Sequence, residues 1–278
     1  MSKQIREQTV EQSLADTSAM AELFEAIGFQ VADERSYNAI VEQVESNGEW
    51  TQLQRGETAL HGRCWRLGDG LEVWSLLYQR DADFYYADCR PAFRSRYVHR
   101  IERWELVEYE EEGEATVRGV VSGPTEVVFE LQNLTELKDE VFRQPHLNVG
   151  LAGITYTARV NAELSYHFEL AERFEGLVDN LCENDYVIGG RVMAWRDIRN
   201  PVTSAELVWI YVDAGVIRLE VLANRQALDG QLKVGAGITA NIWLQGHLLE
   251  HREISARYEG VDRDVEPADY WAALRKDN

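Results

Sequence analysis

At 278 residues the chain is long enough for one large domain or two medium ones, and its 45% hydrophobic and 27% charged residues are typical of a globular protein. The formal net charge of −20 disfavours nucleic acid and anionic lipid as partners unless a local basic patch overrides the overall field. No apolar run approaches the ~18 residues of a membrane-spanning helix, and residues 1–8 lack the apolar stretch of a secretory signal.

The first predicted elements are two short helices. Apolar residues at helical spacing predict a helix over 19–27, with Gly28 as its stop. A second helix follows, for which Ser36 is a plausible N-cap and Gly48 lies just past the end. At the far end of the chain, Pro267 lies in the tolerated first turn of a predicted last helix.

Between these helices the sequence predicts short β-strands. Two β-branched and aromatic runs, 207–212 and 216–221, are joined by a turn that ends at Gly215, which is typical of a hairpin. A second hairpin is predicted around Gly113, with strands near 97–109 and 114–121 that place Glu105 opposite Arg118.

The chain also resembles itself. The block that begins at Leu147 is similar to the block that begins at Leu232, and four weaker blocks precede them in the same order. Among the early blocks Tyr37 corresponds to Phe174, and this offset is much longer than the one between Leu147 and Leu232. We therefore predict an internal duplication in which the first copy carries an insertion of about 50 residues.

Each copy reads as a short helix followed by five strands, so the predicted fold class is mainly β with a few peripheral helices. Short antiparallel strands favour closure, and we predict two tandem small barrel-like, OB-like units. The predicted organisation is an N-terminal helical segment at 1–35, a first unit at 36–170 with the insertion at 94–146, a second unit at 171–255 and a C-terminal helix at 256–278.

Arginines and aromatic residues alternate at the start of the predicted insertion. Residues 90–103 contain five arginines and one glutamate, which gives a local excess of four positive charges in an acidic chain. Arginine guanidinium groups next to aromatic side chains are suited to recognising phosphates, carboxylates or stacked bases. The candidate binding residues are Arg90, Phe93, Arg94, Arg96, Tyr97, Arg100, Arg103 and Trp104.

A structural interpretation of the same arginines competes with this one. A run of glutamates from Glu108 to Glu114 follows directly, so the arginines can form ion pairs with these glutamates across the predicted hairpin. The residues shared by the two copies likewise favour a scaffold role over a ligand role. They are Arg63 and Arg191, Trp65 and Trp195, Arg66 and Arg196, and Trp74 and Trp209.

Three further motifs are better explained by a structural role than by catalysis or metal binding. The string from His247 to His251 fits an inverted zinc-protease pattern, but in a strand its histidines lie about 13 Å apart, too far to share one metal. A calcium-like loop opens at Asp262 but has Pro267 where the turn glycine belongs.

The three cysteines, Cys64, Cys89 and Cys182, form no paired zinc motif and no disulfide scaffold. We read Cys64 and Cys89 as buried free thiols and expect a cytoplasmic protein. No metal, cofactor or catalytic residue is predicted.

These observations favour a non-enzymatic binding or adaptor protein that contacts a protein or an anionic ligand through the arginine–aromatic surface. Nucleic acid and membrane are not expected partners. Two alternatives stay open: a single-stranded nucleic-acid-binding protein of OB type, and an enzyme whose site lies between the two units.

Overall fold

The structure is a computed structural model that describes residues 21–55, 58–81, 83–109, 113–121, 124–161, 163–171 and 182–249. It is mainly β, with two sheets and few helices, and this confirms the predicted class. The segments predicted as the second-copy helix and the C-terminal helix lie outside the described residues, as does the calcium-like loop at Asp262. Within the described part, no helix is long and apolar enough to cross a membrane.

Both predicted N-terminal helices are present in the described residues. Residues 21–26 are helical, and Gly28 ends this segment with φ +90°. The second helix, α2 (Glu34–Asn47), begins two residues before Ser36, because Asp33 is its N-cap. The Asp33 carboxylate accepts from the Ser36 amide at 2.8 Å and the Ser36 hydroxyl accepts from the Asp33 amide at 3.0 Å, so Ser36 completes a capping box.

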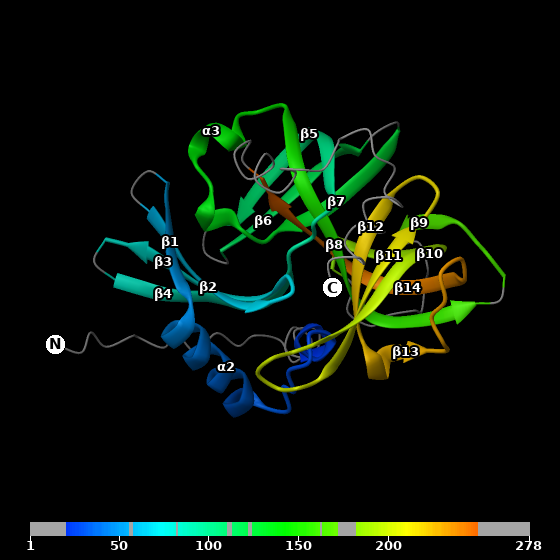
Figure 1. The fold of residues 1–278 in the computed structure, drawn as a ribbon. Coiled ribbons are helices and arrows are strands. Elements are labelled where there is room, and N and C mark those ends of the chain that lie inside the picture. The colour runs from blue at the N-terminus through cyan, green and yellow to red at the C-terminus, as the bar shows by residue number, and fades with distance from the viewer. Residues whose placement is uncertain are drawn as a thin grey trace, which may run out of the picture.

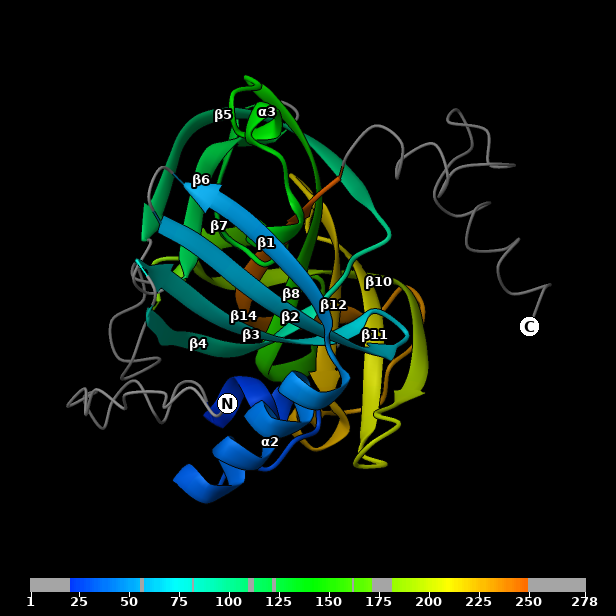
Figure 2. The ribbon, with the colours of Figure 1, turned by 90° about the vertical axis from the view of Figure 1, so that its left-hand side faces the viewer.

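Sheet A is a meander of four antiparallel strands (Figure 2). Its strands are β1 (Glu49–Arg55), β2 (Thr58–Gly68), β3 (Leu71–Arg80) and β4 (Asp83–Phe93), in that order. Helix α2 covers one face of the sheet, where Val44 packs with Val73 and Cys89. The opposite face is turned toward sheet B (Figure 1), and Leu53, Leu60 and Tyr78 on it pack into the core that sheet B also lines.

Sheet B contains the remaining strands. They are β5 (Val98–Tyr109), β6 (Glu114–Val121), β7 (Thr125–Leu131), β8 (His146–Asn161), β9 (His167–Leu170), β10 (Asp185–Arg199), β11 (Glu206–Asp213), β12 (Arg218–Asn224), β13 (Leu228–Asp229) and β14 (Gly237–Leu248). Short helices interrupt it at η1 (Leu134–Glu136), α3 (Asp139–Phe142) and η3 (Arg225–Ala227).

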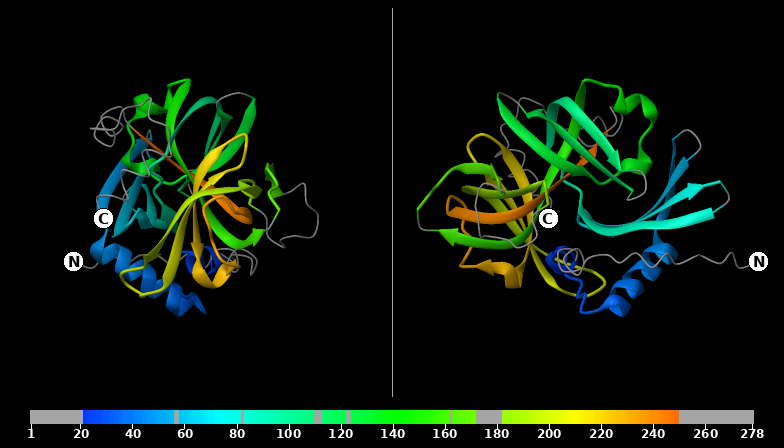
Figure 3. Two further views of the ribbon diagram at one scale, coloured as in Figure 1. Left: turned by 45° about the vertical axis from the view of Figure 1, so that its right-hand side comes forward. Right: turned by 180° about the vertical axis from the view of Figure 1, so that it is seen from behind.

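A long antiparallel ladder between β8 and β14 is the spine of sheet B, running from Val149 opposite Leu248 to Asn161 opposite Gly237. At one end, β5 pairs with β8 and β7 pairs with β14, and β6 joins β5 to β7. At the other end, β12 pairs with β8 and β10 pairs with β14, and β11 joins them. The pairings therefore form two closed circuits that share the spine (Figure 3).

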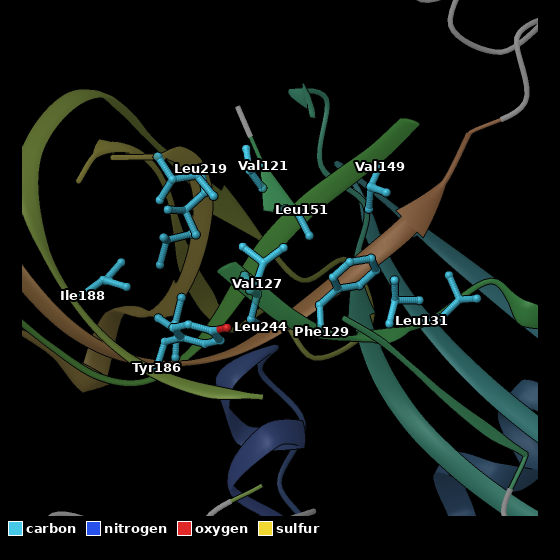
Figure 4. Close-up of a cluster of buried hydrophobic side chains, with 14 of the residues drawn as sticks. Val121, Val127, Phe129, Leu131, Val149, Leu151, Tyr186, Ile188, Leu219 and Leu244 are labelled. Carbon is cyan, nitrogen blue, oxygen red and sulfur yellow. The ribbon is translucent and has the colours of Figure 1, made fainter. Parts of the chain in front are cut away.

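The main apolar core lies around this spine. Figure 4 shows side chains from β6, β7, β8, β10, β12 and β14 converging on it, among them Phe129, Leu151, Ile188 and Leu244. At Gly246 an added Cβ would approach the ring of Phe129 to 2.5 Å, so only glycine lets β14 pass this close to the ring.

Both predicted hairpins are confirmed. β11 and β12 pair as antiparallel neighbours, and β5 and β6 place Glu105 opposite Arg118. The two predicted units share one sheet, however, because β8 lies in the first and β12 and β14 lie in the second. The long-range pairing of β8 with β14 joins the halves, and the tandem OB-like units and their duplication stay predictions.

Candidate functional site

The predicted arginine–aromatic cluster divides into a buried half and an exposed half. Arg90 and Phe93 lie on β4 and are each 1% exposed, so neither can belong to a binding surface. Arg90 lies opposite Trp74, which is fully buried. Arg90 and Phe93 therefore lie in the interior and not on the predicted binding surface, and Arg94, just beyond the end of β4, is 13% exposed.

Arg90 is held by two carboxylates in the interior. Its Nη1 lies 2.7 Å from an oxygen of Glu130 on β7 and 3.5 Å from an oxygen of Asp88 on β4. Its Nη2 donates to the carbonyl oxygens of Leu131 and Gly113. Burial alone would lower the pKa of Arg90, but Glu130 and Asp88 outweigh it and raise that pKa, so the guanidinium stays charged.

One guanidinium thus faces two carboxylates in a site with little water. Burial raises the pKa of Glu130 to about 7, with Arg90 acting in the opposite direction and Asp88 adding to the rise. We call Asp88, Arg90 and Glu130 the first ionic cluster.

Arg94 belongs to a second ionic cluster, formed by Arg94, Glu72, Glu136, Arg66 and His247. Its Nε lies 2.8 Å from Glu72, on β3, and its Nη2 lies 2.9 Å from Glu136, on η1. Arg66 reaches the other oxygen of Glu136 at 2.6 Å. The cluster therefore joins the inner face of sheet A to η1 and, through His247, to β14.

Glu72 and His247 form the most buried contact of this cluster, at 3.1 Å between Oε2 and Nε2. Burial raises the pKa of Glu72, but His247 and Arg94 outweigh it and hold that pKa well below its usual range. Burial and the charge of Arg94 lower the pKa of His247, while Glu72 and Glu136 act in the opposite direction. His247 is thus a core residue on a strand, and the predicted partners of the zinc-protease pattern at 250 and 251 lie outside the described residues.

Two members of the exposed half lie at the junction between β4 and β5. Arg96 is exposed, and its backbone amide donates to the buried carboxylate of Glu220 at 3.2 Å. Tyr97 is half-buried, with its ring against His99 and Tyr211 at centroid distances of 4.9 and 5.5 Å. These contacts fix the entry into β5, and Tyr97 contributes to packing there.

The rest of the exposed half lies on β5. The register between β5 and β6 shifts between Arg103 and Glu105, and this bulge carries Trp104, which is 59% exposed. Arg100 is exposed on the same strand. Arg103 is half-buried, and its Nη1 donates to the carbonyl oxygen of Phe142 at 2.5 Å.

The turn that follows α3 lies beside this part of β5. The Arg103 amide donates to the carbonyl oxygen of Pro145 at 2.8 Å, and His146 lies opposite Glu102 in the ladder between β5 and β8. Arg143 and His146 are both exposed. Arg100, Trp104, Arg143 and His146 are exposed along β5 and the turn that precedes β8, with the exposed Glu102 opposite His146, and we call these four basic and aromatic residues the β5 surface. The sequence pointed to Arg100 and Trp104 but gave no signal for Arg143 and His146, because these two lie in a distant part of the chain.

The two buried cysteines lie on β2 and β4 of sheet A. Cys64 lies opposite Trp74 and Cys89 lies opposite Ser75, and since neighbouring residues of a strand point to opposite faces, the two thiols lie on opposite faces of sheet A. Both are free and buried, as predicted, and burial raises the pKa of each thiol. In the described ranges, no three metal-ligating side chains come together.

The surface also has two shallow hollows of about 480 and 420 Å³ that share Glu206 and Arg225. Arg225 and Asp197, which form an ion pair at 3.4 Å, both line the smaller one. The walls are polar and of mixed charge, and no residue of the predicted cluster lines either hollow. Their shape and lining residues do not indicate a particular ligand.

Of the residues shared by the two predicted copies, one pair of tryptophans lies in the core, whereas Arg66 and Arg191 are exposed. Trp74 and Trp209 are buried, and Arg196 lies over the ring of Trp209 at 5.8 Å. The sequence did not indicate which carboxylates pair with Arg90 and Arg94. Glu72 carried a usable signal, because it interrupts the apolar run from Leu71 to Trp74.

Comparisons with known proteins leave the function open. No protein-family model matches the chain, and no curated protein matches it in sequence. The solved structure of a hypothetical protein from Chlamydia trachomatis aligns with 73% of this chain and 89% of that chain at 11% identity, with a TM-score of 0.13. A TM-score this low carries no argument about fold or function.

Proposed function

We propose that this chain is a non-enzymatic binding protein that docks a protein partner through the β5 surface. The observation that carries the proposal is Trp104, a large ring that a β-bulge turns outward until 59% of it is exposed. Tryptophan and arginine are the side chains that most often dominate protein interfaces, and both occur here within one patch. Bulges commonly re-aim side chains at such sites.

The division of the arginines supports this location. Arg90 and Arg94 are held by interior carboxylates, so they serve the fold and are unavailable to a ligand. Arg100 and Arg143 keep their guanidinium groups at the surface. They suit carboxylates of a partner protein or of a small anion, while the loss of Arg90 and Arg94 from the surface weakens the case for nucleic acid.

The proposal is tested with two variants of the full chain. Trp104→Ala combined with Arg100→Ala removes the ring and one guanidinium, whereas Trp50→Ala removes another half-exposed tryptophan, on β1. Because truncating a hot-spot residue costs about 2 kcal/mol or more, we expect recovery of specific partners to fall about tenfold or more in the double variant. Quantitative mass spectrometry of affinity-captured proteins measures this recovery. Recovery that falls only with Trp50→Ala, or with neither variant, contradicts the proposal.

A further inference from the structure

Three turns of sheet B present exposed apolar side chains. Leu164 and Tyr166 lie between β8 and β9. Val216 lies between β11 and β12, and Val234 lies between β13 and β14. These side chains are between 39% and 61% exposed, and they are four of the nine large apolar side chains that are exposed in the described residues. If the three turns meet, they concentrate much of the exposed apolar surface of the described chain in one place.

Arg191 on β10 shows that the three turns do meet. It lies opposite Asp213, where the turn between β11 and β12 begins, and opposite Gly237, where β14 begins. Its guanidinium lies 6.0 Å from the centroid of the Tyr166 ring. A Cβ added at Gly215 would lie 3.3 Å from the Cβ of Tyr166, so the turn before β12 packs against the segment before β9. We call the resulting surface the three-turn surface, which consists of Leu164, Tyr166, Arg191, Val216 and Val234.

Hydrogen bonds hold two of these turns in place. The Gly235 amide donates to the carbonyl oxygen of Val192 at 2.7 Å, and the Val192 amide donates to that of Ala236 at 2.9 Å. The Gly215 amide donates to the Asp213 carboxylate at 3.0 Å. The exposed valines therefore project from a fixed backbone, and a partner that covers them orders little additional chain.

The charges on and around the three-turn surface are few and of both signs. Arg191, Lys233 and Glu163 are exposed there, and Asp213 pairs with Arg218 at 3.9 Å. When two copies meet around a two-fold axis, the same patch lies on both sides, so a patch with one sign of charge repels its own copy. The β5 surface is basic and has this disadvantage. On the three-turn surface the signs nearly balance, so two chains of net charge −20 can approach there with little local repulsion.

We propose that the three-turn surface is the contact between two copies of this chain, related by a two-fold axis. Leu164, Val216 and Val234 of each copy remove one another from water, and this burial supplies the affinity. Tyr166 and Arg191 add the two residue types, tyrosine and arginine, that are enriched in protein interfaces. The inference is independent of the β5 surface, which stays free for a different partner.

Sedimentation equilibrium of the full chain, at concentrations from about 1 to about 100 µM, tests the proposal. We expect a monomer–dimer equilibrium in this range, because small interfaces are typical of weak association. Val216→Asp brings two like charges near each other across the axis, and we expect the dimer dissociation constant to rise at least about tenfold. A wild-type chain that stays monomeric at about 100 µM overturns the proposal.

The matched control is Val202→Asp, which adds the same charge at a valine that is 49% exposed in the turn between β10 and β11. We expect it to change the dissociation constant by less than about twofold. Val234→Asp places the charge on another turn of the three-turn surface, and we expect it to weaken the dimer as Val216→Asp does. Circular dichroism shows whether each variant keeps the wild-type fold. A dimer that a folded Val216→Asp or Val234→Asp variant retains unchanged, or that Val202→Asp weakens as strongly, overturns the assignment.

A lipid surface is the other occupant that exposed apolar turns can serve, and the net charge of −20 opposes it at anionic membranes. Co-sedimentation with phosphatidylcholine vesicles separates the two. We expect the wild type to stay in the supernatant. Vesicle binding by a monomeric wild type that Val216→Asp abolishes would overturn the second copy and assign the three-turn surface to lipid.

Discussion

Arg90 and Glu130 illustrate how the same residue types serve two purposes in this chain. On β4 the guanidinium of Arg90 lies in a nearly dry site between Glu130 and Asp88, where a charge is tolerated only because it is paired. On β5 Arg100 stays at the surface, on the same strand as the exposed Trp104. The local alternation of arginine and aromatic residues is the same in both places, and burial alone separates structural arginines from candidate binding arginines.

Glu130 gives a testable pH dependence. Its pKa is raised by burial to about 7 in the folded protein, above its ordinary value of 4.5. The folded state therefore retains a proton that the unfolded chain releases, so the stabilising effect is complete below about pH 4.5 and is lost as the pH rises to about 7.

The measurement is the free energy of unfolding of the wild type minus that of Glu130→Gln, obtained by urea denaturation between pH 4.5 and 8. We expect this difference to decrease as the pH rises through that window. His99, with its pKa lowered by burial to about 4, and Asp185, with its pKa raised by burial to about 6, titrate in both proteins and cancel in the difference. A difference that stays constant or increases with pH contradicts the raised pKa.

At the scale of elements, sheet A is joined to its neighbours by ionic clusters as well as by apolar contacts. Glu72 on β3 reaches His247 on β14, and Arg90 on β4 reaches Glu130 on β7. Leu53 and Leu60 add apolar contacts to the main core. Breaking a buried ion pair by removing one partner leaves the other charge uncompensated, so the junction is sensitive to single truncations.

Arg90→Ala tests this junction. We expect the free energy of unfolding to fall by about 3–5 kcal/mol, because the variant leaves the carboxylates of Glu130 and Asp88 without their cation. Arg159→Ala is the matched control, since that side chain is 72% exposed and its pair with Asp229 is screened by water, and we expect a change below about 1 kcal/mol. Urea denaturation measures both. A loss for Arg90→Ala no larger than for Arg159→Ala would show that the buried cluster does not stabilise the fold.

Local elements of the fold were predictable from sequence, and long-range ones were not. The turn at Gly215 and the hairpin register that pairs Glu105 with Arg118 follow from residues close together in the chain. The N-cap was placed at Ser36 because Ser36 and Asp33 suit the same role, and only the backbone geometry distinguishes the cap from the third residue of a capping box. The pairing of β8 with β14 joins segments far apart in the chain, and strand periodicity alone does not specify which distant strands meet.

For the candidate site, the sequence identified the right segment but not the division within it. Whether a strand residue faces the core depends on which sheet covers it, and the cover over Arg90 comes from β7, which belongs to the other sheet. Arg143 and His146 join the β5 surface through bonds to Arg103 and the register with Glu102, which likewise involve distant parts of the chain.

At the scale of the whole molecule, the spine of β8 and β14 carries two closed circuits of strands, and sheet A packs beside it with α2 on its far face (Figure 1). The interior holds paired charges, and acidic residues outnumber basic ones by 48 to 28 over the whole sequence. Within this arrangement the β5 surface combines an exposed tryptophan with exposed arginines, at the root of a hairpin that is otherwise acidic. These properties suit a protein partner with both charged and apolar side chains.

Photo-crosslinking in the full chain tests the location of this surface most directly. Benzoylphenylalanine replaces Trp104 in one variant and Trp50 in the other, so that each probe lies on a half-exposed strand position. We predict that irradiation in cell extract links a discrete protein partner to position 104 and that position 50 gives no such adduct. A discrete adduct at position 50 with none at position 104 would contradict the assignment of the β5 surface.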